Sequence, residues 1–307
     1  MRNAYLDELY ALAGENKNIL ALISDNGTIV YDKYRESFPD QFLNFGISEA
    51  NMISVAAGLA SCGKIPFAYT ITNFLIYRAF EQIRNDVCLQ KMNVKLVGIG
   101  CGFAYSNLGP THHATEDIAL MRALPGMTIF SPSDPRETKK LTVAAAQLDG
   151  PVFLRLATGG TPKIYDEDYE FKVGRGVTLR DGKDMTIIST GGILYDVLQA
   201  VDELEMLGIS VRVINIHTIS PLDSDIILKA AEETRAVLTV EEHSVVGGLG
   251  SAVADVIFSE GNRSVAFKKM GLNRVFPQGY GSHQDMKEMN GLSKKDVMEE
   301  AQALLRG

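Results

Sequence analysis

Residues 95–117, KLVGIGCGFAYSNLGPTHHATED, contain the pattern that decides the fold. The apolar run KLVGIG (95–100) has the length of a buried strand, and it leads into a long loop with several glycines and two adjacent histidines. In open parallel sheets, ligand-binding residues gather in the loops just beyond the carboxyl ends of the strands. The stretch therefore predicts a strand of a parallel sheet that is followed by a binding loop.

Further apolar runs of strand length occur on both sides of this stretch. Strands are expected at 19–24, 65–70, 128–132 and 152–157, and helical patterns at 48–62, 74–91, 114–123 and 135–148. The last helix has a good start signal, because Asp134 is followed by Pro135 at the first helical position. Apolar strands that alternate with helices predict a parallel sheet covered on both faces.

The alternation stops at residues 158–172, TGGTPKIYDEDYEFK, which are polar and suit a linker. A second series follows, with strands expected at 185–190, 211–216, 236–242 and 265–270 and helices at 193–207, 222–233 and 250–260. HTISPLD (217–223) is interpreted as a turn, and S-K-K-D at Ser293 as a capping box that starts a final helix. We predict an α/β fold with domains at 1–160 and 184–307 and a linker at 161–183.

The composition limits the classes of function. The 307 residues are 46% hydrophobic and 22% charged, which is typical of a globular protein with real cores. The net charge of −8 argues against non-specific binding to nucleic acid or to an anionic membrane. The three cysteines lack close-paired spacing, so they favour neither a disulfide framework nor a zinc site. With no signal-peptide core and no membrane-length apolar run, the expectation is a cytoplasmic protein with reduced, mostly buried thiols.

Two more loops follow predicted strands or precede predicted helices in the first domain. FGISEANM (45–52) places Glu49 immediately before an apolar helix. TITNFLIY (70–77) places Phe74 and Tyr77 one helical turn apart on one face. Together with the histidine loop, they make three candidate binding loops at one edge of the predicted sheet.

Each of these loops also has a structural interpretation that the residues alone leave open. Ser48 can cap the helix, with Glu49 complementing its positive end. Phe74 and Tyr77 fit a hydrophobic core, and the histidines fit a satisfied turn. GGLGS (247–251) is similar to a phosphate-cradling loop, but it lacks the full dinucleotide fingerprint.

Longer stretches around these loops resemble the carboxy-terminal half of transketolases, and the resemblance covers essentially the whole chain. In the first predicted domain these stretches are NFGISEANMISVAAGLA (44–60), FLIYRAFEQIRND (74–86) and GPTHHATEDIALMRALPGMTIFSPSDPRE (109–137). In the second they are residues 185–223 and VEEHSVVGGLG (240–250). Deoxyxylulose-phosphate synthases and the β subunits of 2-oxo-acid dehydrogenases share this plan, but GPTH and EDIALMRALPGM are closer to transketolase. The resemblance implies a parallel-sheet pyrimidine-binding domain followed by a transketolase carboxy-terminal α/β domain.

The resemblance implies thiamin diphosphate as cofactor. In the family, the glutamate that matches Glu49 hydrogen-bonds a ring nitrogen of the aminopyrimidine, which favours the tautomer that deprotonates the thiazolium carbon. Phe74 and Tyr77 match the aromatic contacts to the pyrimidine ring, and Ile71 falls where some members carry a third aromatic residue. Asp25 is counted with these as a candidate cofactor-binding residue.

The same resemblance implies a substrate channel. His112 matches the histidine of the GPTH motif, which faces substrate oxygens and helps with proton transfer, and His113 is assigned to the channel beside it. Three positions depart from the family: Leu108 replaces an acid, Gly100 a histidine and Thr158 an arginine that grips the sugar phosphate. Loss of the arginine removes a planar bidentate clamp, so we expect a non-standard sugar substrate.

One family element is missing. The chain has no GDG followed by the asparagine that holds magnesium and the diphosphate, and RDGKD (180–184) lacks the leading glycine. We therefore predict no metal site in this chain, with Mg²⁺ held mainly by a separate amino-terminal, diphosphate-binding transketolase subunit. Because the family's cofactor lies between domains of different subunits, the resemblance implies a self-associating α₂β₂ heterotetramer.

The leading hypothesis is a split-transketolase subunit that transfers a two-carbon ketol unit from a ketose to an aldose. One alternative is another thiamin-dependent acyloin-forming synthase, similar to deoxyxylulose-phosphate synthase. A second alternative is a non-catalytic regulatory partner of the same fold. The presence of Glu49, Phe74, Tyr77 and His112 argues against this second alternative, because a non-catalytic chain has no chemical reason to keep all four.

Overall fold

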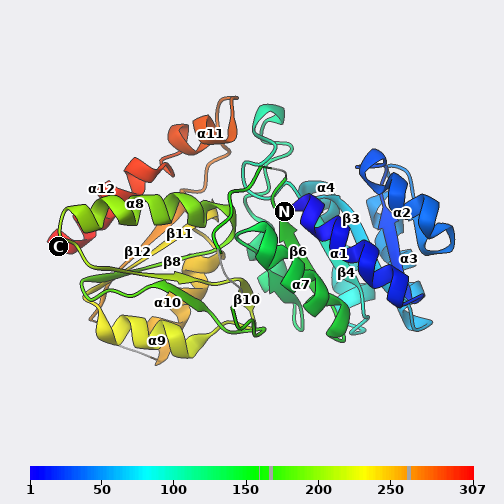
Figure 1. Cartoon of the computed structure of the whole chain (residues 1–307), viewed down its shortest axis with the longest axis horizontal. Coiled ribbons are helices and arrows are strands. Elements are labelled where there is room, and N and C mark those ends of the chain that lie inside the picture. Colours follow the sequence, from blue (N-terminus) through cyan, green and yellow to red (C-terminus); the bar gives the residue numbers. More distant parts are fainter. Residues whose placement is uncertain (159, 166–168, 261–263) are drawn as a thin grey trace.

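The chain forms two α/β units that lie side by side (Figure 1). The computed structural model describes residues 1–158, 160–165, 169–260 and 264–307. Residues 159 and 166–168 of the polar stretch between the predicted domains lie outside the described residues. Within the described part of the chain, no helix is both long enough and apolar enough to cross a bilayer.

The first unit is built on a seven-stranded sheet in the order β10-β5-β6-β4-β3-β1-β2. Neighbouring strands pair in parallel, except that β10 joins the edge antiparallel to β5. The strands are β1 (Ile19–Ile23), β2 (Phe42–Asn44), β3 (Ile65–Ile71), β4 (Lys95–Ile99), β5 (Thr128–Phe130), β6 (Val152–Leu156) and β10 (Thr218–Ser220). The parallel sheet predicted for this unit is thus confirmed.

Helices cover both faces of the first sheet. The core on one face contains residues of α1 and α7, and the core on the other contains residues of α3, α4 and α6. The helices of this unit are α1 (Arg2–Glu15), α2 (Asp32–Ser37), α3 (Glu49–Ser61), α4 (Thr72–Arg78), α5 (Phe80–Gln82), α6 (Asp117–Arg122) and α7 (Pro135–Gln147). Shorter helical turns are η1 (Ile29–Tyr31), η2 (Pro39–Gln41), η4 (Ser106–Leu108) and the π-helix η3 (Ile83–Cys88).

The second unit has a five-stranded sheet in the order β12-β11-β8-β9-β7. Its strands are β7 (Val177–Arg180), β8 (Met185–Ser189), β9 (Val211–Asn215), β11 (Ala236–Ser244) and β12 (Ala266–Leu272), and only β7 among them pairs antiparallel. Its helices are η5 (Gly191–Ile193), α8 (Leu194–Met206), α9 (Ser224–Glu233), α10 (Leu249–Glu260), α11 (His283–Met289) and α12 (Lys294–Arg306). Residues of α8 and α12 form the core on one face.

The two units share a hydrophobic core. One cluster of buried residues includes Met52 and Ile118 of the first unit together with Ile227 and Val253 of the second. This cluster joins α3 and α6 to α9 and α10, so burial of apolar surface holds the units together. Helices α3 and α6 of the first unit are therefore held in place partly by the second unit.

Two predicted helix starts are confirmed. The Asp134 side chain accepts from Glu137 N at the start of α7, and Ser293 forms a full capping box with Asp296 at the start of α12. Ser48 is different, because it stands at the N-cap of α3 without a side-chain cap bond. The alternative interpretation, in which the Ser48 side chain caps this helix, is therefore not supported at Ser48, although Glu49 does lie in the first turn.

Several elements depart from the prediction. The helix expected at 74–91 is divided into α4, α5 and the π-helix η3. HTISPLD (217–223) is more than a turn, because it contains β10, which pairs Thr218 with Phe130 of β5. The predicted linker, 161–183, contains β7, which belongs to the second sheet. The elements α1, α2, β2 and α11 had no prediction, and their short or weakly patterned sequences explain why.

Candidate functional site

The candidate site lies at the carboxyl ends of neighbouring strands in the first sheet. The strands β4, β3, β1 and β2 are adjacent in that order, and they run parallel. The segments that follow them therefore emerge at the same edge. These segments carry the three loops predicted to bind, together with the loop after β1 that contains Asp25.

Glu49 is the first residue of α3, and its side chain is only 3% exposed. Arg78 Nη1, at the end of α4, donates to Glu49 Oε2 over 3.2 Å. The Arg78 guanidinium also lies over the Phe74 ring, 4.4 Å from its centroid. The backbone N–H of Ser48 donates to Ser24 Oγ, which ties the start of α3 to the end of β1. The buried carboxylate is thus held at a helix start with a cationic partner.

Hydrogen bonds join α4 to the GPTH loop. Asn73 Nδ2 donates to the carbonyl oxygens of Thr111 and His113, at 3.0 and 2.8 Å. These bonds hold the Phe74 ring edge-on to the His112 ring, with centroids 5.1 Å apart. Helix α4 and the GPTH loop, which lie more than thirty residues apart in the sequence, thus meet at one surface.

Tyr77 is anchored to the same loop. Its hydroxyl donates to Glu116 Oε2 at 2.7 Å, and the side chain remains 40% exposed. Burial of the hydroxyl and the nearby acidic groups raise the pKa of Tyr77 well above its ordinary value. The tyrosine is therefore a neutral donor whose ring is fixed at the surface.

His113 lies on the inner side of the loop. Its side chain is 2% exposed and packs edge-on against Phe103, with centroids 5.5 Å apart. Neither ring nitrogen has a hydrogen-bond partner among the described residues, and burial lowers the pKa of His113. His113 is thus more deeply buried than its neighbour His112, and its assignment to the substrate channel stays a prediction.

The remaining predicted residues have surroundings of their own. Asp25, which is exposed, exchanges hydrogen bonds with Asn44 at 3.1 and 3.3 Å. Leu108 is 46% exposed. Thr158 lines a cavity of about 250 Å³ between the two units, together with Glu242, His283 and other residues. Gly100 directly follows β4 and lies beneath the ring of Tyr105.

Sequence reasoning missed Arg78, Tyr105 and Glu116. Arg78 carried a usable signal, because it lies four residues after Phe74 and shares its helix face. Tyr105 and Glu116 lie in the long loop, where spacing gives no orientation. Their roles depend on contacts that only the folded chain shows.

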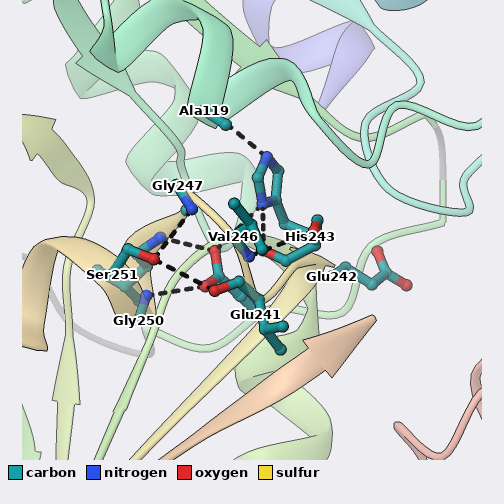
Figure 2. Close-up of polar contacts among 12 residues, drawn as sticks. Ala119, Glu241, Glu242, His243, Val246, Gly247, Gly250 and Ser251 are labelled. Atoms are coloured by element: carbon teal, nitrogen blue, oxygen red, sulfur yellow. Dashed lines mark hydrogen bonds and ion pairs between the residues drawn. The ribbon is translucent and has the colours of Figure 1, made fainter. Parts of the chain in front are cut away.

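The glycine loop that is similar to a phosphate cradle is already filled by a carboxylate (Figure 2). Glu241 accepts hydrogen bonds from Leu249 N at 2.7 Å and from Gly250 N at 2.8 Å, at the start of α10. A Cβ on Gly248 would lie 2.2 Å from Glu241 Oε2, so this glycine admits the carboxylate. The loop is a helix start stabilised by an internal anion.

His243 connects the two units beside this loop, as Figure 2 shows. Its Nε2 accepts from Ala119 N at 3.3 Å, and its Nδ1 lies 2.7 Å from Ser244 O. Because an amide N–H only donates and a carbonyl only accepts, the proton belongs on Nδ1. Arg155 adds a second connection, since its Nε donates to Asp117 Oδ2 and its Nη2 to Glu242 O.

Among the described residues, no group of three or more His, Cys, Asp or Glu could hold a metal ion.

Two family models match the chain. The transketolase pyrimidine-binding domain matches residues 1–162, and the transketolase C-terminal domain matches residues 174–297. The chain belongs to the transketolase family. The two α/β units described above correspond to these two domains.

Named relatives are similar over most of the chain. An apulose-4-phosphate transketolase subunit of Phocaeicola vulgatus is 39% identical over 83% of both proteins. The 6-deoxy-6-sulfo-D-fructose transketolase subunit SqwH of Clostridium sp. is 36% identical over 98% of this chain and 93% of the relative. A solved structure of a split-gene transketolase, described as an inactive β4 tetramer, is 40% identical, with a TM-score of 0.90 over 99% of this chain and 97% of its own.

Proposed function

We propose that this transketolase-family chain is the carboxy-terminal subunit of a two-chain, thiamin diphosphate-dependent transketolase. It transfers a two-carbon ketol unit from a ketose to an aldose. The observation that carries the proposal is the contact of Phe74 with His112, beside the Glu49–Arg78 ion pair. The contacts gather a buried carboxylate, an aromatic ring and a histidine, which supports their use as one cofactor and substrate site.

The residues at this surface fit the cofactor. Glu49 is a buried acceptor, suited to a ring N–H of the aminopyrimidine, and a charge-assisted hydrogen bond contributes about 1.5–3 kcal/mol. Phe74 and Tyr77 offer flat rings for contact with the pyrimidine, and Asp25 lies on the neighbouring loop. Thiamin diphosphate supplies the electron sink for cleavage of the carbon–carbon bond. His112 exchanges a proton with a substrate oxygen.

The proposal assigns the diphosphate and most of the Mg²⁺ ligands to a separate amino-terminal subunit. Support comes from the absence of the GDG motif in this sequence and from two relatives whose names describe them as subunits. The solved relative, described as an inactive tetramer of β chains, agrees with a chain that needs a partner. The expected assembly is an α₂β₂ heterotetramer.

Calorimetric titration tests the need for a partner. The purified single chain is expected to bind thiamin diphosphate and Mg²⁺ negligibly. The chain co-purified with the product of the neighbouring open reading frame is expected to bind them. Micromolar binding by the single chain would refute the two-chain proposal, and transfer from pyruvate would favour the acyloin-forming synthase.

The proposed substrate is a non-standard sugar. Leu108, Gly100 and Thr158 remove an acid, a histidine and an arginine from the positions that grip ordinary sugar phosphates in the family. The two named relatives support this proposal, because their names specify apulose 4-phosphate and 6-deoxy-6-sulfofructose. A sugar with a branched, deoxygenated or sulfonated far end is therefore expected.

Steady-state kinetics of the two-chain complex tests the substrate. Its kcat/KM with xylulose 5-phosphate and ribose 5-phosphate is expected to be low, and a value of roughly 10⁴ M⁻¹s⁻¹ or above would contradict altered specificity. The variant Thr158→Arg is expected to raise kcat/KM with phosphorylated sugars and to leave the cofactor affinity unchanged. The exposed variant Lys163→Arg, which adds no charge, serves as its control.

A further inference from the structure

The ring of Tyr105 covers the backbone of Gly100 at the end of β4. Gly100 has φ of +85°, and a Cβ built on it would lie 2.1 Å from Tyr105 Cε2 and 2.2 Å from Cδ2. Carbon atoms in contact are normally about 3.5–4.0 Å apart. Only glycine at position 100 therefore admits the ring, and the tyrosine fills the space that a side chain at position 100 would use.

Tyr105 is also placed against the candidate site. Its ring lies edge-on to the His112 ring, with centroids 6.2 Å apart. The Asn26 side chain, on the loop after β1, lies close enough to the tyrosine hydroxyl to favour its ionised form. Leu108 N donates to Tyr105 O at 3.0 Å, which fixes the backbone on the other side. The ring thus spans the distance between the β1 loop and His112.

The chemistry of this wall differs from that of an imidazole. A histidine at position 100 would offer a polar nitrogen or a charge to a sugar hydroxyl or phosphate. The tyrosine offers mainly an apolar ring, and its hydroxyl stays neutral because burial raises the pKa of Tyr105. A ring of this kind packs against carbon and excludes groups that need a polar partner.

We propose that Tyr105 is a specificity-determining residue of the transfer reaction, acting as an apolar wall beside His112. The wall selects ketose donors that place a branched or deoxygenated carbon against the Tyr105 ring. It disfavours straight-chain, fully hydroxylated sugar phosphates. The inference rests on the proposed function and assigns the side chain that controls its substrate class. It also explains Gly100, whose missing side chain makes room for the ring.

Donor kinetics of the two-chain complex tests the inference. The kcat/KM values with D-xylulose 5-phosphate and with apulose 4-phosphate are measured for the parent, Tyr105→Ala and Tyr105→Phe. In Tyr105→Ala, the kcat/KM with D-xylulose 5-phosphate divided by that with apulose 4-phosphate is expected to rise at least about tenfold. This is within the range typical of apolar pocket contacts. In Tyr105→Phe, which keeps the ring, the ratio is expected to stay within about threefold. Tyr10→Ala, on the outer helix α1, is the matched control.

A second pair of variants keeps the test decisive if Tyr105→Ala folds poorly. Gly100→Ala displaces the ring and is expected to shift the ratio in the same direction. It is expected to leave the ratio unchanged in the Tyr105→Leu background, because that background has no ring for the new methyl group to displace. The backbone strain at position 100 is the same in both backgrounds. If these variants fold and bind thiamin diphosphate as tightly as the parent, an unchanged ratio overturns this inference. The proposed function is unaffected by that outcome. Full activity of Glu49→Gln in the same assay overturns the proposed function instead.

Discussion

Arg78 Nη1 donates to Glu49 Oε2 across 3.2 Å, from the end of α4 to the start of α3. The two side chains differ in burial, since Glu49 is 3% exposed and Arg78 is 51% exposed. A buried carboxylate without a partner is costly, and Arg78 supplies the opposite charge from the solvent side. The pair therefore orients the carboxylate that the proposed mechanism uses.

The variant Glu49→Gln tests the catalytic role of this carboxylate. Glutamine keeps the shape and an acceptor oxygen, but it cannot stabilise a protonated ring nitrogen by charge. In the two-chain complex we expect kcat to fall on the order of a hundredfold or more, as for the loss of one preorganised electrostatic contact. The melting temperature is expected to change little, because a helix-end charge contributes about 0.3–1 kcal/mol. Clear destabilisation with unchanged turnover would identify Glu49 as a structural residue only.

The variant Arg78→Met tests the ion pair. Methionine retains an apolar stem over Phe74 but leaves the Glu49 carboxylate without its cation. We expect a loss of about 1 kcal/mol in the free energy of unfolding, since one partner is half exposed. In the Glu49→Gln background the loss is expected to be smaller, and urea unfolding of all four proteins gives the coupling energy. Additive effects of the two substitutions would show that the pair has no energetic role.

The fold class could be predicted because its determinants are local. Strand β1 is a continuous apolar run, β4 and β6 are apolar except for Lys95 and Arg155, and the caps at Asp134 and Ser293 are formed within one helical turn. The strand β10 could not be predicted, because three residues of HTISPLD gain strand structure only by pairing with β5, almost ninety residues earlier. The antiparallel β7 depends in the same way on β9.

The candidate site could be predicted only to the level of its loops. Positions at the ends of parallel strands indicated the loops of Glu49, Phe74, Tyr77 and His112, and the resemblance to transketolases indicated their roles. The contact of Phe74 with His112 depends on the bonds of Asn73 to the loop backbone, which the sequence does not show. The ring of Tyr105 over Gly100 is likewise a contact of side-chain shape. No spacing rule describes which way a loop side chain turns.

The variant Glu241→Gln tests the filled glycine loop at the start of α10. The carboxylate is 2% exposed and accepts from Leu249 N and Gly250 N, so its charge stabilises two unpaired helix N–H groups. We expect a loss of about 1.5–3 kcal/mol, as for hydrogen bonds to a charged group. Chemical denaturation measures it, and the exposed Asp255→Asn on the same helix is the control. A loss no greater than that of the control would contradict the assignment.

The pair of His283 Nε2 with Glu242 Oε1 predicts a pH dependence of stability. The Glu242 carboxylate raises the pKa of His283 above its ordinary value of 6.5. Burial opposes the charge of Glu242, but attraction from His283, Lys287 and Arg155 outweighs it and lowers the pKa below 4.5. The histidine's contribution is complete below its unfolded pKa and is lost as pH rises through the folded one. The carboxylate's contribution is complete above its unfolded pKa and is lost as pH falls through the folded one.

Stability is therefore expected to depend on this pair most strongly between the two ordinary values, 4.5 and 6.5. Because the His283 side chain is 40% exposed, the cost of His283→Gln at pH 5.5 is expected to be below about 1 kcal/mol. The cost is expected to shrink at pH 9 and at pH 3, where one partner is neutral. Urea unfolding at the three pH values measures it, with His112→Gln, which removes a histidine bonded to the neutral Thr111 hydroxyl, as control. A cost for His283→Gln that does not vary across these pH values would show that packing, and not the ion pair, holds α11 against β11.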